Sequence, residues 1–343
     1  MNIWILKRDL SGEVQHTQTS EHDMNEDYIT LDSSRFDIIK QDITYNKGDF
    51  LIAKFEDTSN FSYFGVITSK EDNTFVCKTM LSLLDFDIPT ARIKGNSFEE
   101  HARDLINKYL INDPTKMSDK IVVDIATNTP HNYQPKEPPS VTTLTKYMIN
   151  GFKKYNIVWE FDRVEDGKIY TVLRRIDRKL SLKNNLDYLY GWEFSNTEVG
   201  VGVANKLLIV DKATTDMMNP KILSTWYITE ENILTQNAND PKIYRPTKTV
   251  VNIYDTTEEK KPAYSDVADE ELKGSTYSHE IRCIMRRNNN MISDDDIKIG
   301  TKYSINYDNE IYESVIAGYS FKDETEVELR FGHIRSKFSE LLE

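Results

Sequence analysis

The stretch 324-ETEVELRFGHIRSKFSELLE-343 changes its apolar period part-way along. From Glu326 to Phe331 apolar and charged residues alternate, which predicts a strand with one apolar and one charged face. Gly332 interrupts the pattern, and from Ile334 onward apolar residues recur at helical spacing. We therefore expect a strand that closes a sheet, followed by a C-terminal helix. So short a helix is marginal alone in water, so it should dock on the body of the protein or on another subunit.

The two faces of this strand have different expected environments. Burial of an aliphatic or aromatic side chain contributes about 1.5 to 3 kcal/mol, so the apolar face should point into a barrel core. The charged face must point away from that core, toward a channel, a neighbouring subunit or bulk water, and the sequence leaves these three open. The apolar residues are Val327, Leu329 and Phe331, and the charged ones are Glu326, Glu328 and Arg330.

Composition restricts the class of protein. The chain has 343 residues, 38% hydrophobic and 29% charged, with 19 Tyr and 14 Phe, which is typical of a soluble protein rich in strands. Its formal net charge of -13 argues against a protein that holds nucleic acid by neutralising phosphates. Cys77 and Cys283 are too few and too far apart for a disulfide framework or a zinc site, so we expect both to be buried. No run approaches the ~18 apolar residues of a membrane span, so no membrane insertion is expected.

The pattern of elements predicts a multi-domain α+β fold. Short strands with polar turns fill residues 1–92, which we assign to a first small β-barrel, possibly completed by strands within 200–255. Residues 93–190 form an expected inserted α/β domain. Residues 191–262 are expected to be a β-rich connecting region, and 263–343 a second β-barrel with the C-terminal helix.

The inserted domain carries the clearest local signals. Ser97 with Glu100 three residues later is a capping-box pattern and predicts the start of a helix that ends near Asp113. A second helix is expected over Thr143–Tyr155, after a loop that holds four of the ten prolines. Two strands, 156–163 and 168–176, should then form a hairpin that turns at 165–167.

No pattern in the sequence predicts an active site. His279-Glu280 begins like a zinc-binding helix, but Cys283 stands where the second histidine is required. Asp294-Asp295-Asp296 lacks the alternation of a calcium loop and favours a solvated turn. Gly200-Val201-Gly202 lacks the third glycine of a dinucleotide fingerprint. We therefore predict no catalytic, cofactor-binding or metal-binding residue and no cofactor.

Several segments together resemble one known family. The segments are Asn46–Ile52 (NKGDFLI), Tyr63–Ile67 (YFGVI), Lys78–Phe86 (KTMLSLLDF), Ser278–Ile281 (SHEI), Ile299-Gly300, Tyr312–Ile316 (YESVI) and Val327–Arg335 (VELRFGHIR). On these segments the chain resembles the tail hub proteins of phages and prophages of Gram-positive bacteria. The likeness spans nearly the whole chain.

The resemblance implies a fold similar to the baseplate hub of contractile-tailed phages. It implies two barrels per chain in a homotrimer, so that six barrels continue the tail tube at the tail tip of the virion. The implied partners are the distal tail protein, the tail tube proteins and the tape-measure protein. DNA would pass through the lumen without specific binding, which agrees with the acidic balance.

Two other functions are weighed beside the hub. A host-surface glycan-binding module is the alternative, because Tyr188, Tyr190 and Trp192 lie close in sequence and sugar sites favour aromatic surfaces. A hydrolase that uses a carboxylate pair is the third hypothesis, but no motif in the sequence positions a general acid near a general base. We therefore predict a structural protein without enzymatic activity.

Overall fold

The computed structural model describes most of the chain. The described residues are 1–28, 31–39, 43–58, 62–90, 97–130, 140–183, 186–196, 204–216, 218–231, 233–257, 261–273, 279–287, 289, 292–293 and 296–332. The expected C-terminal helix after Gly332 lies outside the described residues, as do Gly200-Val201-Gly202 and Asp294-Asp295. The protein is mostly β with a minority of helix, so the α+β class is confirmed. No described helix is both long and apolar enough to span a membrane.

The chain divides into two compact units. The large unit contains Met1–Glu193 and Arg282–Phe331, and the small unit contains Phe194–Ile281. The two parts of the large unit belong together because residues before 194 and after 281 share one sheet. Each unit is described separately below.

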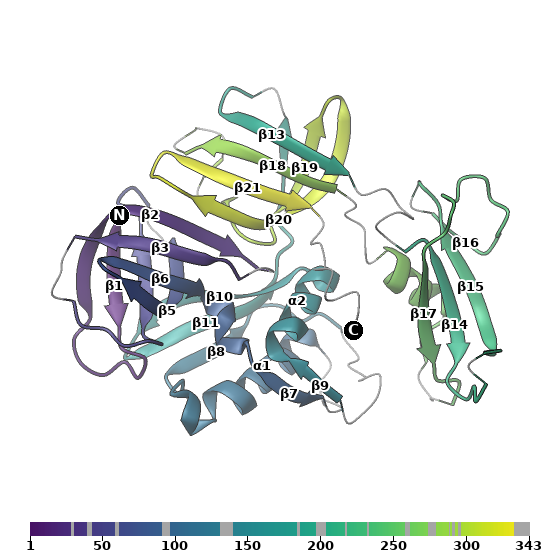
Figure 1. Ribbon diagram of the computed structural model, residues 1–343, viewed down its shortest axis with the longest axis horizontal. Helices are drawn as coiled ribbons and strands as arrows, with labels where there is room; N and C mark the ends of the chain where they lie inside the picture. The colour runs from purple at the N-terminus through teal and green to yellow at the C-terminus, as the bar shows by residue number, and fades with distance from the viewer. Residues whose placement is uncertain are drawn as a thin grey trace. The chain divides into compact units, whose positions relative to one another are not determined.

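Six N-terminal strands of the large unit form a closed cycle of antiparallel pairs (Figure 1). The pairings run β1-β4-β5-β6-β3-β2 and return from β2 to β1. Several aromatic residues of the cycle are fully buried, among them Phe36, Phe50 and Phe75. The strands are β1 (Asn2–Leu6), β2 (Gln15–Asp27), β3 (Ser33–Ile38), β4 (Phe50–Lys54), β5 (Tyr63–Glu71) and β6 (Thr74–Thr79).

A second sheet of the large unit is built from strands far apart in sequence. Its order is β12-β19-β20-β21-β18-β13. The long strand β20 pairs with β19 and β21 and also with the end of β2, where Met24 lies opposite Phe321, so it joins both sheets. The strands are β12 (Lys179–Lys183), β13 (Leu189–Asn196), β18 (His279–Arg286), β19 (Lys302–Tyr307), β20 (Glu310–Phe321) and β21 (Glu326–Gly332).

Strand β21 follows the predicted alternation. Val327, Leu329 and Phe331 are at most 1% exposed, so the predicted apolar face is confirmed. On the charged face, Arg330 has a partner within the chain, which the sequence did not predict. Arg330 forms an ion pair with Asp27 of β2 at 2.9 Å inside the same unit, because β20 brings the two strands to its opposite edges.

The helical part of the large unit agrees with the local signals. Helix α1 (Phe98–Ile106) begins where Ser97 Oγ accepts a hydrogen bond from the Glu100 N–H at 3.1 Å, as the capping box predicted. Helix α2 (Leu144–Tyr155) is capped in the same way by Thr143. Strands β10 (Ile157–Glu165) and β11 (Lys168–Arg175) form the expected hairpin, and β8 (Ile121–Ile125) adds a parallel strand to β11.

Shorter elements complete this region. The pair β7 (Asp87–Thr90) and β9 (Ser140–Thr143) is antiparallel. The remaining pieces are a 3-10 helix η1 (Met80–Leu84), a π-helical turn η2 (Asn107–Ile111) and a 3-10 turn η3 (Pro114–Lys116).

The small unit is a four-stranded sheet with one helix on it. The order is β16-β15-β14-β17, and Leu207, Ile209 and Ile228 pack against Val267 and Leu272. These strands pair with one another, whereas the sequence had left open that they complete the first barrel. The elements are β14 (Lys206–Asp211), β15 (Ile222–Ile228), β16 (Leu234–Thr235), β17 (Thr249–Tyr254), α3 (Tyr264–Ala268) and a π-helical turn η4 (Asp269–Lys273).

Candidate functional site

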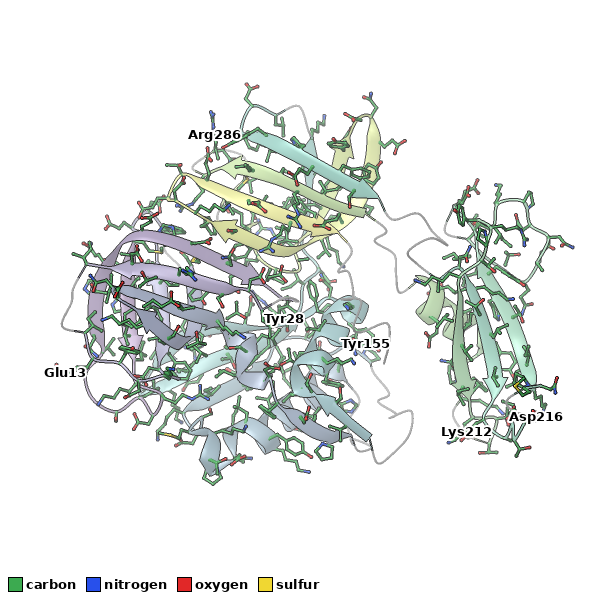
Figure 2. All side chains as sticks on the ribbon, viewed as in Figure 1. Glu13, Tyr28, Tyr155, Lys212, Asp216 and Arg286 are labelled. Carbon is green, nitrogen blue, oxygen red and sulfur yellow. The ribbon has the colours of Figure 1, made fainter. Side chains whose placement is uncertain are left out.

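A cavity of about 420 Å³ lies inside the large unit. Its walls come from the end of β2, from β5, β6 and η1, from β10 and β11, from the segment before β19, and from β20. Tyr28, labelled in Figure 2, follows β2, and its hydroxyl accepts a hydrogen bond from the Trp159 N–H at 2.9 Å. The cavity therefore lies where the N-terminal cycle, the β10–β11 hairpin and the second sheet converge. Its size falls in the range of small-molecule sites.

Aromatic side chains form much of the apolar wall. Phe64 of β5 and Phe161 of β10 stack with ring centroids 4.6 Å apart, and Phe55 lies 5.1 Å from Phe321. Trp159 also lines the cavity and is held in place by a hydrogen bond from its Nε1 to Thr171 Oγ1 at 2.9 Å. Because these side chains are fixed by packing, the cavity is preformed rather than created by a ligand.

Glu26 is the least compensated acid of the cavity. Burial raises the pKa of its carboxyl to about 8, and the neighbouring charges of Asp27 and Glu160 add to the rise. Among the described residues, no hydrogen bond and no cation lowers its pKa. At neutral pH the carboxyl is therefore mostly protonated.

The other cavity acids have cationic partners. Glu160 forms an ion pair with Arg174 and also lies in the field of Lys298, although burial still raises its pKa. Asp27 pairs with Arg330, and Gly318 makes room for this pair, since a Cβ there would lie 2.7 Å from Asp27 Oδ2. The remaining cavity acid, Asp162, pairs with Arg163.

Two buried hydroxyl groups lie at the cavity. They belong to Tyr63, 3% exposed, and Thr79, 4% exposed. The Ser34 hydroxyl donates to the Asn25 carbonyl and accepts from the Asn25 N–H, and it is also a hydrogen-bond partner of the Tyr63 hydroxyl, since a hydroxyl oxygen has two acceptor lone pairs. The Thr79 hydroxyl has no partner among the described residues, which indicates room for a water molecule beside it.

The Tyr63 side chain lies back along its own strand. A Cβ at Gly65 would be 2.4 Å from the Tyr63 hydroxyl oxygen, so only glycine at position 65 leaves space for the ring. Gly65 in turn pairs with Thr79 across β5 and β6. The hydroxyls of Tyr63 and Thr79 are therefore neighbours on one wall.

The arrangement is suited to binding. It offers one uncompensated carboxyl, two hydroxyl groups and aromatic walls. Within the described part of the chain, no three His, Cys, Asp or Glu side chains are grouped so as to hold a metal ion.

The motifs weighed in the sequence do not meet at this cavity. His279 begins strand β18 rather than a helix, and Cys283 on that strand is fully buried. Asp296 is 7% exposed and pairs with Arg178, so this residue of the acidic run does not lie in the expected solvated turn. Cys77 is fully buried as well, which confirms the expectation for both cysteines.

The aromatic residues of the glycan hypothesis lie on β13 and just before it. Arg286, labelled in Figure 2, lies over the Tyr190 ring at 5.6 Å, and a hydrogen bond to Glu326 raises the pKa of Tyr190. The Trp192 ring lies 5.8 Å from that of Tyr307. Glu326 thus points toward β13, and the aromatic rings contact neighbouring strands of their own sheet.

Comparison with known proteins gives structural matches only. No protein-family model and no curated protein sequence matches the chain. The tail protein from Neisseria meningitidis MC58 is 13% identical, with 96% of each chain covered and a TM-score of 0.57. The 43 kDa tail protein of prophage MuSo2 from Shewanella oneidensis is 13% identical, with 98% of each chain covered and a TM-score of 0.55.

A third match is another prophage tail protein. Prophage tail protein gp18 from Listeria monocytogenes EGD-e is 10% identical, covers 100% of this chain and 97% of its own, and has a TM-score of 0.55. The chain has the fold of these tail proteins. The resemblance to phage tail proteins that the sequence indicated is thereby confirmed at the level of the fold.

Proposed function

We propose that the chain is a structural hub of a phage-type tail, located at the tail tip of the virion. The observation that carries this proposal is the match to three tail proteins over 96% to 100% of the chain. These matches extend over both units of the chain. Fold alone does not specify function, so the role rests on this likeness and on the arrangement of strands.

The strand pairings support a two-barrel arrangement in the hub. We assign the first barrel to the cycle of β1 to β6 and the second to the sheet of β12, β13 and β18 to β21. Since β20 pairs with strands of both, the two form one stiff element that is suited to a tube wall. Three chains would contribute six such barrels, which matches a sixfold tube.

The partners follow from this placement. They are two further copies of the chain, the distal tail protein and tail tube proteins, and the tape-measure protein. DNA would pass through the lumen without being held, because a net charge of -13 provides little attraction for phosphates. The four sequence segments 1–92, 93–190, 191–262 and 263–343 stay our prediction for the domains of the assembled hub.

We propose no enzymatic activity. The cavity of the large unit has no arrangement in which a nucleophile is set beside a base, and a structural role requires none. The glycan-binding alternative has less support, because the rings of Tyr190 and Trp192 are engaged by Arg286 and Tyr307.

Electron microscopy of the virion that carries this chain tests the proposal. We expect a threefold ring of the chain at the tail tip, labelled by an antibody against the small unit, and tails that do not assemble when the gene is deleted. A twofold or sixfold ring of this chain would contradict the trimer. Complete tails without the protein would remove the hub role, and loss of adsorption alone would favour glycan binding.

A further inference from the structure

We propose that the open edge of strand β17 in the small unit pairs, in solution, with the same strand of a second copy of this chain. The two strands are antiparallel and related by a twofold axis at Val251. The pairing does not rest on the tail role, because β17 belongs to neither of the two barrels that we assign to the hub. It follows from the backbone and side chains of this strand, from the other sheet edges and from the flanking charges.

The main chain of β17 has one paired side and one open side. The strand is the last in the order β16-β15-β14-β17, and among the described strands it pairs only with β14. The Tyr254 carbonyl accepts a hydrogen bond from the Lys212 N–H on the β14 side at 2.9 Å. Alternate residues of a strand direct their backbone groups to the same side, so the intervening residues direct theirs to the open edge. These residues are Thr249, Val251 and Ile253.

The side chains of the same residues are exposed and include two aliphatic groups. Val250 and Tyr254 pack in the core of the small unit, so the residues that alternate with them lie on the opposite face. On that face Val251 is 48% exposed and Ile253 is 54% exposed. Ile253 lies opposite Val210 of β14, so an aliphatic row that crosses the sheet ends at the open edge. A further strand would extend this row.

Other edge strands of the protein carry features that discourage pairing. Strand β12 has exposed Lys179 and Lys183 at its two ends, β13 contains Gly191 at a φ of +60°, and β16 is only two residues long. Charges, backbone irregularities and short lengths are the usual protection of a sheet edge. Strand β17 has six residues, with no charged residue, proline or glycine among them. An unprotected edge of this length indicates a strand that is covered by another strand.

The charges that flank β17 favour an antiparallel copy over a parallel one. Lys248 precedes the strand and Asp255 follows it. An antiparallel copy brings each of them toward the opposite charge of the other chain, whereas a parallel copy would place like charges side by side. Asp255 also pairs with Lys212 at 3.0 Å within its own unit, so the flanking charges set the orientation and add little affinity.

The register follows from the residues whose backbone groups are open. Only with the axis at Val251 do all three of these residues lie opposite one another, with Thr249 facing Ile253 of the second copy. Each opposed pair then exchanges both of its N–H···O bonds. The contact is self-complementary, so one strand supplies both sides, and the exposed aliphatic side chains become buried.

Sedimentation equilibrium of the full chain tests the pairing. We expect a monomer–dimer equilibrium with a Kd of about 1 to 100 μM, because a single strand edge buries less area than a standard interface. Hydrogen exchange of residues 249–253 should slow as the dimer forms, since their open amides gain acceptors.

Two charge variants test the strand and its register together. Val251→Lys and Val251→Glu each place like charges opposite one another at the axis, so each should weaken dimerisation at least about tenfold. An equimolar mixture of the two should form a heterodimer at least about tenfold tighter than either homodimer. Recovery in the mixture also shows that both variants are folded.

Ile311→Lys is the matched control, because Ile311 is a 68% exposed aliphatic residue on strand β20 of the large unit. This variant should dimerise like the wild type. The proposal is overturned if the chain stays monomeric up to about 500 μM, if Val251→Lys dimerises normally, or if the mixture shows no recovery. A trimer that the Val251 variants leave intact would support the hub and overturn the β17 pairing.

Discussion

Glu26 and Glu99 are two carboxylates of the large unit whose pKa values shift in opposite directions. Glu26 lies at the cavity, where burial raises its pKa to about 8. Glu99 is 0% exposed, yet its pKa is lowered. Burial alone would raise the pKa of both, so the difference must come from what each carboxylate contacts.

The contacts of Glu99 explain its ionised state. Its oxygens accept hydrogen bonds from Thr127 Oγ1 at 2.6 Å, from the Thr129 N–H at 2.8 Å and from Thr129 Oγ1 at 2.9 Å. It also lies in the first turn of α1, where the helix dipole favours an anion. Hydrogen-bond donors therefore outweigh burial at Glu99, whereas Glu26 has a cavity in place of donors.

Removal of the Glu99 side chain should have the largest effect on stability. Glu99→Ala leaves three donors without an acceptor, and we expect the free energy of unfolding at pH 7 to fall by about 3 kcal/mol. The contribution of the wild-type carboxylate is present above its unfolded pKa of about 4.3 and is lost as the pH falls through its lowered folded pKa. Urea denaturation of the wild type and the variant from pH 3 to pH 7 measures the loss at pH 7 and its dependence on pH.

Asp104 on the same helix is exposed and serves as the matched control. Asp104→Ala should change the free energy of unfolding by less than about 0.5 kcal/mol. Equal losses in the two variants would show that helix α1, and not the Glu99 hydrogen bonds, governs the effect.

Glu26→Gln should have an effect of opposite sign that depends on pH. Between the unfolded pKa of about 4.3 and the folded value of about 8 the folded state holds a proton that the unfolded state has lost, so wild-type stability falls as the pH rises. The variant lacks this loss. We expect the free energy of unfolding of Glu26→Gln to equal that of the wild type at pH 4. At pH 9 it should be higher by on the order of 2 kcal/mol, which is less than the full pKa shift implies because solvent reaches this half-buried group.

Denaturation of both proteins at pH 4, 7 and 9 checks this prediction. A stability difference that is the same at all three pH values would mean that the pKa of Glu26 is the same in the folded and unfolded states, and the contrast with Glu99 would be lost.

A pair of hydroxyl deletions gives the smallest expected effects. Thr129→Val removes a hydroxyl that donates to Glu99 and should lower the free energy of unfolding by about 1 kcal/mol. Thr79→Val removes a hydroxyl without a partner among the described residues and should leave stability equal or raise it by up to about 1 kcal/mol. Thermal unfolding of the two variants side by side measures the difference, and a loss in Thr79→Val as large as in Thr129→Val would show that the Thr79 hydroxyl is engaged.

Local elements with a strong signal could be predicted from the sequence. The Ser97–Glu100 capping box, the β10–β11 hairpin and the apolar face of β21 depend on residues a few positions apart, so their period and turn chemistry identify them. Strand β2 carries no such local signal. Its buried residues include Thr17, Thr19 and His22, so its sequence does not show the apolar alternation of a strand. In the structure it nevertheless pairs with β1, β3 and β20.

The sequence by itself determined the class of the fold, the resemblance to tail proteins and the elements whose period is set by near neighbours. Only the tertiary structure decided which strands share a sheet, because a strand's period fixes its buried face but not its partner. It also decided the cavity, since Glu26, Tyr63, Thr79 and Glu160 come from β2, β5, β6 and β10. A carboxyl's pKa depends on the water and donors around it, and long-range packing alone sets those at Glu26.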